Sequence, residues 1–394
     1  MLLFISVLAI CIISRSEADF FIPSIPHLQE YFGLTDFATE LSLSFNFTGY
    51  CIGGLLSGML GDRFNQRTII ICNLTVFVVA TFVCMLAPTY EILLFGRLLQ
   101  GFSIAGATVI GYVLLILDNK FSDQLKKLGL INGILTLIMA IVPTIGGHFG
   151  LYKHWRFNFL AVLVLSIAAL YLTRLSIKKI PKVLPVSRTE RKTTYPVSYI
   201  TLLKSGRILI FAATLCFIMT PYWVFISMSP IYYVKDLQVP LIEYIYYKNL
   251  LSIIFGVVSI ANGLLIRVIG CKRCLFLSIK LCLVSVLCQL IIVLGDINNP
   301  VFITISMGIL AAGAAFLINF LYANALNSAA NNICKTSALI HSVRLVFTSV
   351  CLSVVSHFYT GSFLVIGIAL ITMLLPGIAF IIYLYKKGSL GLSM

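Results

Sequence analysis

The feature that most constrains this chain is a series of long apolar runs separated by short polar segments. A run of about 20 apolar residues crosses the hydrocarbon core of a bilayer as an α-helix, because a helix satisfies its own backbone hydrogen bonds. A transmembrane β-barrel would instead show shorter segments of alternating hydrophobicity. The sequence predicts twelve transmembrane helices, at residues 2–26, 38–60, 68–88, 90–117, 126–148, 156–176, 206–234, 243–268, 274–295, 300–327, 335–358 and 361–385.

The overall composition also indicates a membrane protein. Of the 394 residues, 60% are hydrophobic and 10% are charged, whereas a soluble domain carries about 25% charged residues. This composition cannot form a water-soluble core with a polar shell. The predicted fold class is therefore an all-α polytopic membrane protein.

The positive charge of the chain predicts its orientation. A net charge of +15 could indicate a nucleic-acid partner, but Lys and Arg cluster in short segments between the apolar runs. That distribution follows the positive-inside rule rather than a nucleic-acid surface. With both termini in the cytoplasm, about twenty of the 28 basic residues fall on that side. We therefore predict cytoplasmic termini and no nucleic-acid partner.

The most polar stretch lies at the middle of the chain and is rich in Lys, Arg and Pro. Twelve helices with a charged central linker indicate two six-helix halves that arose by duplication, as in many transporters. The predicted domains are an N-terminal six-helix half at 1–177, a basic cytoplasmic linker at 178–205 and a C-terminal six-helix half at 206–394.

The first apolar run, "MLLFISVLAICII", allows two interpretations, because the acidic segment "SEADFF" follows it closely. It could be a signal peptide cleaved after Ala18, or the first transmembrane helix. It lacks the positively charged start that is typical of a signal peptide, and its removal would leave eleven apolar runs. We therefore predict one uncleaved helix over residues 1–26.

Three charged residues near the end of this helix are candidates for proton coupling. Arg15 and Asp19 are four residues apart and share a helix face, whereas Glu17 points elsewhere, so Arg15 and Asp19 can pair. Burial favours the protonated form of Asp19 and a neighbouring arginine favours the ionised form, so this carboxyl group can bind and release a proton near neutral pH. The alternative is a permanent structural ion pair. Glu17 is the second candidate.

The segment "GMLGDRFNQR" at residues 58–67 resembles motif A of the major facilitator superfamily, G-x-L-x-D-R-x-G-R-R. Asn65 replaces the usual glycine, and Asn is the next best residue for a left-handed backbone. A rough echo, "GLLIRVIGCKR", lies at residues 263–273, where a repeat predicts it. The alternative is a basic loop that only sets the topology. The resemblance implies a cytoplasmic gate formed by Gly58, Asp62, Arg63 and Arg67.

The run at 90–117 contains a lone arginine, Arg97, followed by Gln100 and Gly101. An arginine within the membrane is costly unless it is paired or hydrated, so we expect Arg97 to face the protein interior. Gly101 and Ala105 extend a small-residue stripe on the same face, which permits close helix packing. The pattern resembles motif B of the superfamily, R-x-x-Q-G, and implies a place on the substrate or proton pathway. The alternative is an arginine that extends to the membrane interface.

The run at 126–148 resembles motif C, the antiporter signature G-x8-G-x3-G-P-x2-G-G. Ile138 and Val142 stand where the motif has glycines. We expect the proline and the paired glycines to break or kink this helix near its outer end. The alternative is a packing helix with no role in the direction of transport. The residues that match the motif are Gly129, Pro143, Gly146 and Gly147.

The pattern D-x-x-x-P-x-x-P followed by F-G, in "ADFFIPSIPHLQEYFG", resembles the first helix of the Bcr/CflA-type drug-resistance transporters. This resemblance implies a proton-coupled antiporter that exports drug-like or small amphipathic molecules across the bacterial inner membrane. The implied partners are a small-molecule substrate, protons and the lipid bilayer, and we expect a monomer. We expect no cofactor, no metal and no enzymatic activity, and the sequence contains no G-x-x-x-x-G-K-[ST] signature of ATP binding.

Two other functions stay open from the sequence. A proton symporter that imports a nutrient or metabolite differs from an exporter only in direction, and the incomplete motif C permits it. A non-transporting membrane sensor is the alternative from another class, although no appended soluble domain supports it.

Overall fold

The structure is a computed structural model. It describes residues 2–21, 25–116, 120–152, 155–177, 199–329 and 332–391. Within these ranges, the side chains of residues 18–20, 25–26, 36–37, 39–40, 140–152, 177, 200 and 241 are outside the description.

The described residues form twelve helices of 20 residues or more, at the positions that the apolar runs predict. Nine of them are long and apolar enough to cross a membrane, judged on the described residues alone. Two short helices, α2 (Ile25–Phe32) and α8 (Tyr199–Lys204), and a π-helical turn, η3 (Ile231–Asp236), accompany them. The long helices are α1 (Leu2–Phe21), α3 (Asp36–Gly61), α4 (Gln66–Leu86), α5 (Tyr90–Ile116), α6 (Phe121–Tyr152), α7 (Arg156–Ile177), α9 (Gly206–Pro230), α10 (Leu241–Ile269), α11 (Cys271–Leu294), α12 (Pro300–Asn327), α13 (Ile333–Phe358) and α14 (Phe363–Lys386).

The described part of the first predicted helix is α1, which covers Leu2–Phe21, and α2 begins at Ile25. Residues 22–24 lie outside the described residues, so one continuous helix over residues 1–26 stays a prediction. Helix α6 continues through Pro143, so the proline does not break that helix, while the expected kink stays a prediction. Proline is tolerated there because neighbouring groups can satisfy the carbonyl that it frees.

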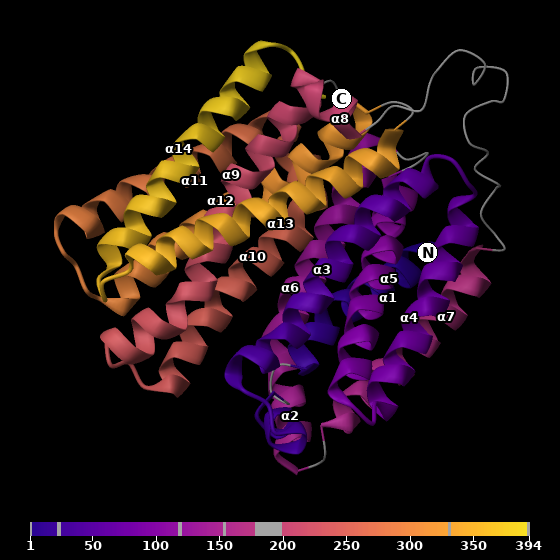
Figure 1. Ribbon diagram of the computed structural model, residues 1–394. Helices are drawn as coiled ribbons and strands as arrows, with labels where there is room; N and C mark the ends of the chain where they lie inside the picture. Colours follow the sequence, from indigo (N-terminus) through magenta and orange to yellow (C-terminus); the bar gives the residue numbers. More distant parts are fainter. Residues whose placement is uncertain are drawn as a thin grey trace, which may run out of the picture. The chain divides into compact units, whose positions relative to one another are not determined.

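The described residues form two compact units. Unit 1 groups the described parts of Met1–Asp118, Ile138–Tyr199 and Ala330–Ser342. In this unit α5 packs against α3, α4 and α1, while α7 packs against α1 and α4 (Figure 1). Helix α5 is central because nearly all of its residues from Gln100 to Ile116 are buried.

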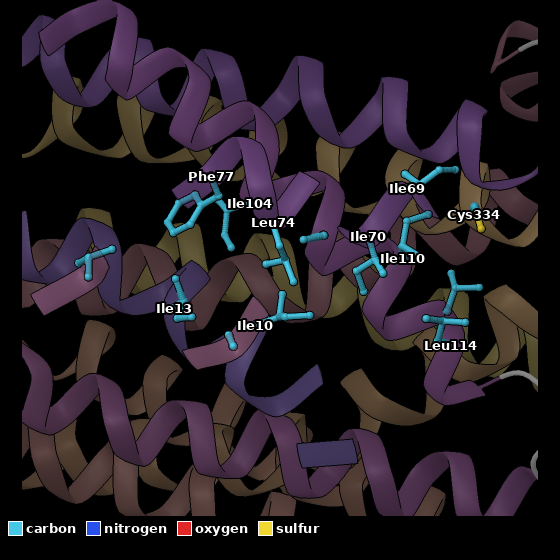
Figure 2. Close-up of a cluster of buried hydrophobic side chains, with 14 residues drawn as sticks. Ile10, Ile13, Ile69, Ile70, Leu74, Phe77, Ile104, Ile110, Leu114 and Cys334 are labelled. Atoms are coloured by element: carbon cyan, nitrogen blue, oxygen red, sulfur yellow. The ribbon is translucent and has the colours of Figure 1, made fainter. Parts of the chain in front are cut away.

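The core of unit 1 is a cluster of aliphatic side chains from several helices (Figure 2). Helix α1 contributes Ile10 and Ile13, which are almost fully buried. The first helix is therefore packed into the folded unit, which favours a retained membrane helix over a cleaved signal peptide. The other labelled members are Ile69, Ile70, Leu74 and Phe77 of α4, Ile104, Ile110 and Leu114 of α5, and Cys334 of α13.

Helices α3 and α5 approach each other through glycines. A Cβ atom on Gly53 would lie 1.9 Å from the carbonyl oxygen of Phe102, and one on Gly49 would lie 2.1 Å from that of Leu98. Such distances leave no room for any side chain, so the two backbones touch directly. Small residues at a membrane helix interface permit this close packing.

Unit 2 groups the described parts of Asn119–Leu137, Ile200–Ala329 and Val343–Met394. Helix α12 packs against α9, α10 and α11, and α14 packs against α9 and α11 (Figure 1). The sequence echo of motif A falls at the junction between α10 and α11. Gly270 there has φ of +83°, a backbone conformation that glycine adopts without strain. Gly270 alone separates the end of α10 from the start of α11. The predicted division at residues 178–205 stays a prediction, since most of that linker lies outside the described residues.

The α3–α5 contact predicts that Gly53→Ala destabilises the protein. The added methyl group would meet the backbone of Phe102, so we expect a loss of about 1–3 kcal/mol in unfolding free energy and a lower melting temperature of the detergent-purified protein. Gly206→Ala is the matched control, since nothing lies within 4 Å of a Cβ at that position. Equal melting temperatures for the two variants would contradict the close approach.

Candidate functional site

Arg97 lies deep within unit 1, in the second turn of α5. Its side chain is fully buried, and its guanidinium carbon lies 4.4 Å from the centre of the Phe21 ring. Helix α5 is buried along most of its length, so its middle turns point into protein rather than lipid. The prediction that Arg97 faces the interior is confirmed, and the alternative of an arginine extending to the membrane interface is excluded.

The partner of Arg97 is Glu17 of α1. Arg97 Nη1 donates a hydrogen bond of 2.9 Å to Glu17 Oε2, and the two side chains are 0% and 2% exposed. A charge buried away from water is very costly without an opposite charge, so each residue depends on the other.

Gln100 extends the ion pair into a hydrogen-bonded network. Arg97 Nη1 also donates to Gln100 Oε1 at 3.0 Å, and Gln100 Nε2 donates to Thr81 Oγ1 of α4 at 2.9 Å. Helical spacing explains this arrangement, because residues three apart lie on one face of α5. The network therefore connects α1, α5 and α4 through polar groups that are all buried.

The guanidinium of Arg97 has unused hydrogen-bonding capacity. Its Nε and Nη2 atoms are buried and have no hydrogen-bond partner among the described residues. Beside the pair lies a crevice too tight for a water molecule, lined by Glu17, Phe21, Gln100, Asn158, Phe159 and Val162. These two nitrogen atoms can therefore donate hydrogen bonds to an anionic or carbonyl group in a conformation that admits one.

The charged residues of α1 are arranged differently from the sequence prediction. Glu17, expected to point away from the functional face, lies inside against Arg97. Arg15 is half-buried, and the side chain of Asp19 lies outside the described residues, so the predicted Arg15–Asp19 pair is not tested. The Glu17–Arg97 pair was missed because it joins residues 80 positions apart. The available signal was that each is a costly charge in an otherwise apolar run.

Gly101 brings α5 against α3 one turn beyond Arg97. A Cβ at this position would lie 1.9 Å from the carbonyl oxygen of Asn46. The Asn46 side chain in turn donates a hydrogen bond of 3.2 Å to the carbonyl oxygen of Arg97. The small residue after Gln100 thus has the packing role that the sequence predicts.

A second candidate site surrounds Asp62, at the end of α3. The two carboxylate oxygens of Asp62 accept hydrogen bonds from the backbone N–H groups of Cys334 and Lys335, at 3.0 and 3.1 Å. These amides belong to the first turn of α13 and have no partner within that helix. A carboxylate at a helix N-terminus also gains from the helix dipole. Asp62 therefore caps a helix from the opposite half of the sequence.

The surroundings of Asp62 are tightly packed and partly desolvated. A Cβ on Gly58 would lie 2.6 Å from that of Ala338 and 2.7 Å from the hydroxyl oxygen of Tyr199. Burial raises the pKa of the Asp62 carboxyl group. The hydrogen bonds from the two backbone amides lower this pKa, but by less than burial raises it. Burial and the nearby Asp62 charge raise the pKa of Tyr199. The predicted gate residues Gly58 and Asp62 thus lie in one contact with α13.

The rest of the 58–67 segment departs from the motif-based expectation. Asn65 is not left-handed: its φ is −64°, and its side chain accepts a hydrogen bond from the backbone of Arg67 as the N-cap of α4. Asn is among the best N-cap residues, so capping decides its conformation. Arg63 is exposed, and the Arg67 Nε and Nη2 atoms are buried without a hydrogen-bond partner among the described residues.

Among the four residues that match motif C, the structure describes the contacts of Gly129 only. A Cβ at Gly129 would lie 2.3 Å from the carbonyl oxygen of Ser259, and the Ser259 hydroxyl donates to the carbonyl oxygen of Gly129 at 3.1 Å. Gly129 is therefore a close-packing position between α6 and α10 in unit 2. The surroundings of Pro143, Gly146 and Gly147 lie outside the described residues.

The buried pair predicts strong mutual dependence of Glu17 and Arg97. Glu17→Gln leaves a buried, unpaired guanidinium, so we expect a loss of about 3–5 kcal/mol in unfolding free energy. The double variant Glu17→Gln/Arg97→Gln removes both charges and should be more stable than Glu17→Gln alone. Thermal unfolding in detergent measures both. Additive losses in the double variant would contradict direct pairing.

The cap on α13 predicts that Asp62→Ala destabilises the protein by about 1–2 kcal/mol, because two helix-terminal N–H groups lose their acceptor. Glu30→Gln, which alters an exposed carboxylate in the same unit, is the control. Hydrogen exchange at the first turn of α13 gives the more direct measurement and should accelerate in Asp62→Ala alone. Unchanged exchange there would refute the cap.

A model of the Major Facilitator Superfamily matches residues 3–346, which is most of the chain. Among curated relatives, an uncharacterized transporter of Rickettsia bellii is 23% identical over 171 residues, covering 43% of this chain and 42% of the relative. The multidrug resistance protein MdtL of Escherichia coli is 25% identical over 173 residues, covering 43% of this chain and 44% of MdtL. The matches thus span less than half the length of these relatives.

Solved structures agree on the fold over nearly the whole chain. The outward conformation of the transporter FucP has a TM-score of 0.72 at 13% identity, covering 96% of this chain and 98% of FucP. The human organic anion transporter MFSD10 has a TM-score of 0.71 at 11% identity, with the same coverage of both chains. At such low identity these likenesses concern the fold alone. The chain belongs to the Major Facilitator Superfamily, whose members are multi-pass membrane transporters and not enzymes.

Proposed function

We propose that the chain is a proton-coupled antiporter that exports small amphipathic or drug-like molecules across the bacterial inner membrane, with Glu17 and Arg97 as the coupling pair. The observation that carries this proposal is the fully buried ion pair between α1 and α5. An intramembrane ionisable residue is costly to keep, and such residues commonly form proton or substrate pathways. No cofactor is needed, since the proton gradient supplies the driving force.

The chemistry of the pair explains how one proton could change the conformational equilibrium. Protonation of Glu17 removes its charge and leaves Arg97 buried without a counter-ion, which is unfavourable in a dry interior. A conformation that supplies Arg97 with water, or with an anionic or polar group of a substrate, is then favoured. Coupling requires only that proton and substrate stabilise different members of one conformational equilibrium.

Three neighbours of the pair have supporting roles in this proposal. Gln100 holds Nη1 of Arg97 and keeps the guanidinium oriented when Glu17 is neutral. Asp19 follows Glu17 by two residues and is the second candidate proton carrier, with Arg15 as its partner. The buried Nε and Nη2 atoms of Arg97 provide donors for an incoming group.

The relatives support the direction only weakly. The MdtL protein of Escherichia coli is named as a multidrug resistance protein, and it matches less than half of this chain. Membership of the Bcr/CflA-type subfamily is therefore part of the proposal. The alternative is proton-coupled uptake of a nutrient, which the two non-glycine residues of motif C, Ile138 and Val142, leave open.

The test is transport in inside-out membrane vesicles, with ethidium as a drug-like cation. An acidic vesicle interior should drive ethidium accumulation, and a protonophore should abolish it. In Glu17→Gln, the rate of ethidium accumulation driven by the pH gradient should fall at least tenfold. Exchange of ethidium for ethidium in the absence of a gradient should continue. Exchange distinguishes lost coupling from lost folding, because a misfolded transporter performs neither.

Matched variants separate the candidate proton carriers. Asp19→Asn should reduce gradient-driven accumulation if Asp19 carries the proton, and Glu30→Gln, an exposed carboxylate, should leave it unchanged. Full gradient-driven transport by Glu17→Gln would remove Glu17 from the mechanism. If substrates from a metabolite panel accumulate only when protons and substrate move in the same direction, the chain is a symporter and the export proposal fails.

A further inference from the structure

A lysine on the lipid-facing side of unit 2 has no role in the transport pathway proposed above. Lys280 lies in α11, nine residues after its first residue, and its side chain is exposed. At a rise of 1.5 Å per residue, it lies about 13 Å along the helix from that start. It has no hydrogen bond or ion pair among the described residues.

The surroundings of Lys280 are apolar. Leu277, Leu283, Val284 and Leu287 lie three to seven residues away on the same side of α11, and each is exposed. An exposed apolar stripe on a membrane helix faces acyl chains, so Lys280 interrupts a lipid-facing surface. The positive-inside rule accounts for basic residues at the ends of helices but not for one this far along.

The geometry of an α-helix directs Lys280 toward the basic end of α11. Side chains on a helix lean toward its N-terminus, so the ammonium group extends back toward the start of α11. Arg273 lies seven residues earlier, almost two full turns, and therefore on the same face. Both side chains are exposed, and the ring of Phe276 lies between their levels.

The end of α14 adds aromatic and basic groups beside this face. The Tyr385 ring lies 5.2 Å from that of Phe276 and 5.9 Å from the Lys272 ammonium nitrogen. Lys386 and Lys387 follow it and are exposed. Neither α11 nor α14 contains an Asp or Glu that could neutralise these charges.

We propose that this face binds a phospholipid with an anionic headgroup. The phosphate lies between Lys280 and Arg273, and the acyl chains lie along the exposed apolar stripe of α11. Charge complementarity supports a lipid at this face. Along α11 a basic cluster is followed by an apolar stripe, just as the anionic headgroup of a phospholipid is followed by its acyl chains. Tyr385 supports the same assignment, because Tyr is enriched where membrane helices meet the headgroup layer.

The test is native mass spectrometry of the detergent-purified protein titrated with phosphatidylglycerol, with phosphatidylcholine of identical acyl chains as the neutral comparison. We expect the first phosphatidylglycerol to bind at least fivefold more tightly than phosphatidylcholine. Lys280→Gln should remove this preference, while Lys280→Arg should retain it. Lys120→Gln, which removes an exposed charge away from α11 and α14, is the matched control and should bind as the unchanged protein does.

Several results would overturn the proposal. Lys280→Gln could bind phosphatidylglycerol as well as the unchanged protein, or the two lipids could bind equally. Glycerol 3-phosphate could displace the lipid at equal concentration, which would assign the site to a free phosphate compound. A dimer that dissociates in Lys280→Gln would assign the face to a second copy of this chain. Lys280→Leu, which matches the neighbouring stripe, repeats the test if the Gln variant folds poorly.

Discussion

Inside a membrane protein, a buried charge requires an opposite charge, and in unit 1 that requirement is met by Arg97 and Glu17. The pair joins α1 to α5, and Gln100 and Thr81 connect it to α4. Three helices therefore depend on one interaction from which water is excluded in this conformation. The same property makes the pair sensitive to a proton, because loss of one charge leaves the other without compensation.

Close backbone contacts between α3 and α5 hold the helix that carries Arg97 in place. Helices α3 and α5 meet through Gly49, Gly53 and Gly101, which bring their backbones into direct contact. Hydrophobic burial cannot drive this association, because lipid is as apolar as the side chains, so tight packing of small residues is decisive. The cap that Asp62 places on α13 adds a polar contact between segments far apart in the sequence.

Much of the fold could be predicted because hydrophobic run length has a direct physical meaning in a bilayer. The starts of α4, α5 and α12 lie within two residues of the predicted ones. Asn65 was misjudged, because a residue that tolerates left-handed backbone is equally suited to cap a helix.

The sequence by itself determined that this chain forms a bundle of long membrane helices, since their length and apolar character follow from bilayer thickness and backbone hydrogen bonding. It also identified Arg97 as a residue that needs a partner, and the motif A resemblance singled out Asp62. Only the tertiary structure decided which groups those partners are. Arg97 pairs with Glu17, and Asp62 accepts hydrogen bonds from the first-turn amides of α13. Helical periodicity relates neighbours within one helix, whereas pairing between helices depends on how they pack and rotate against one another.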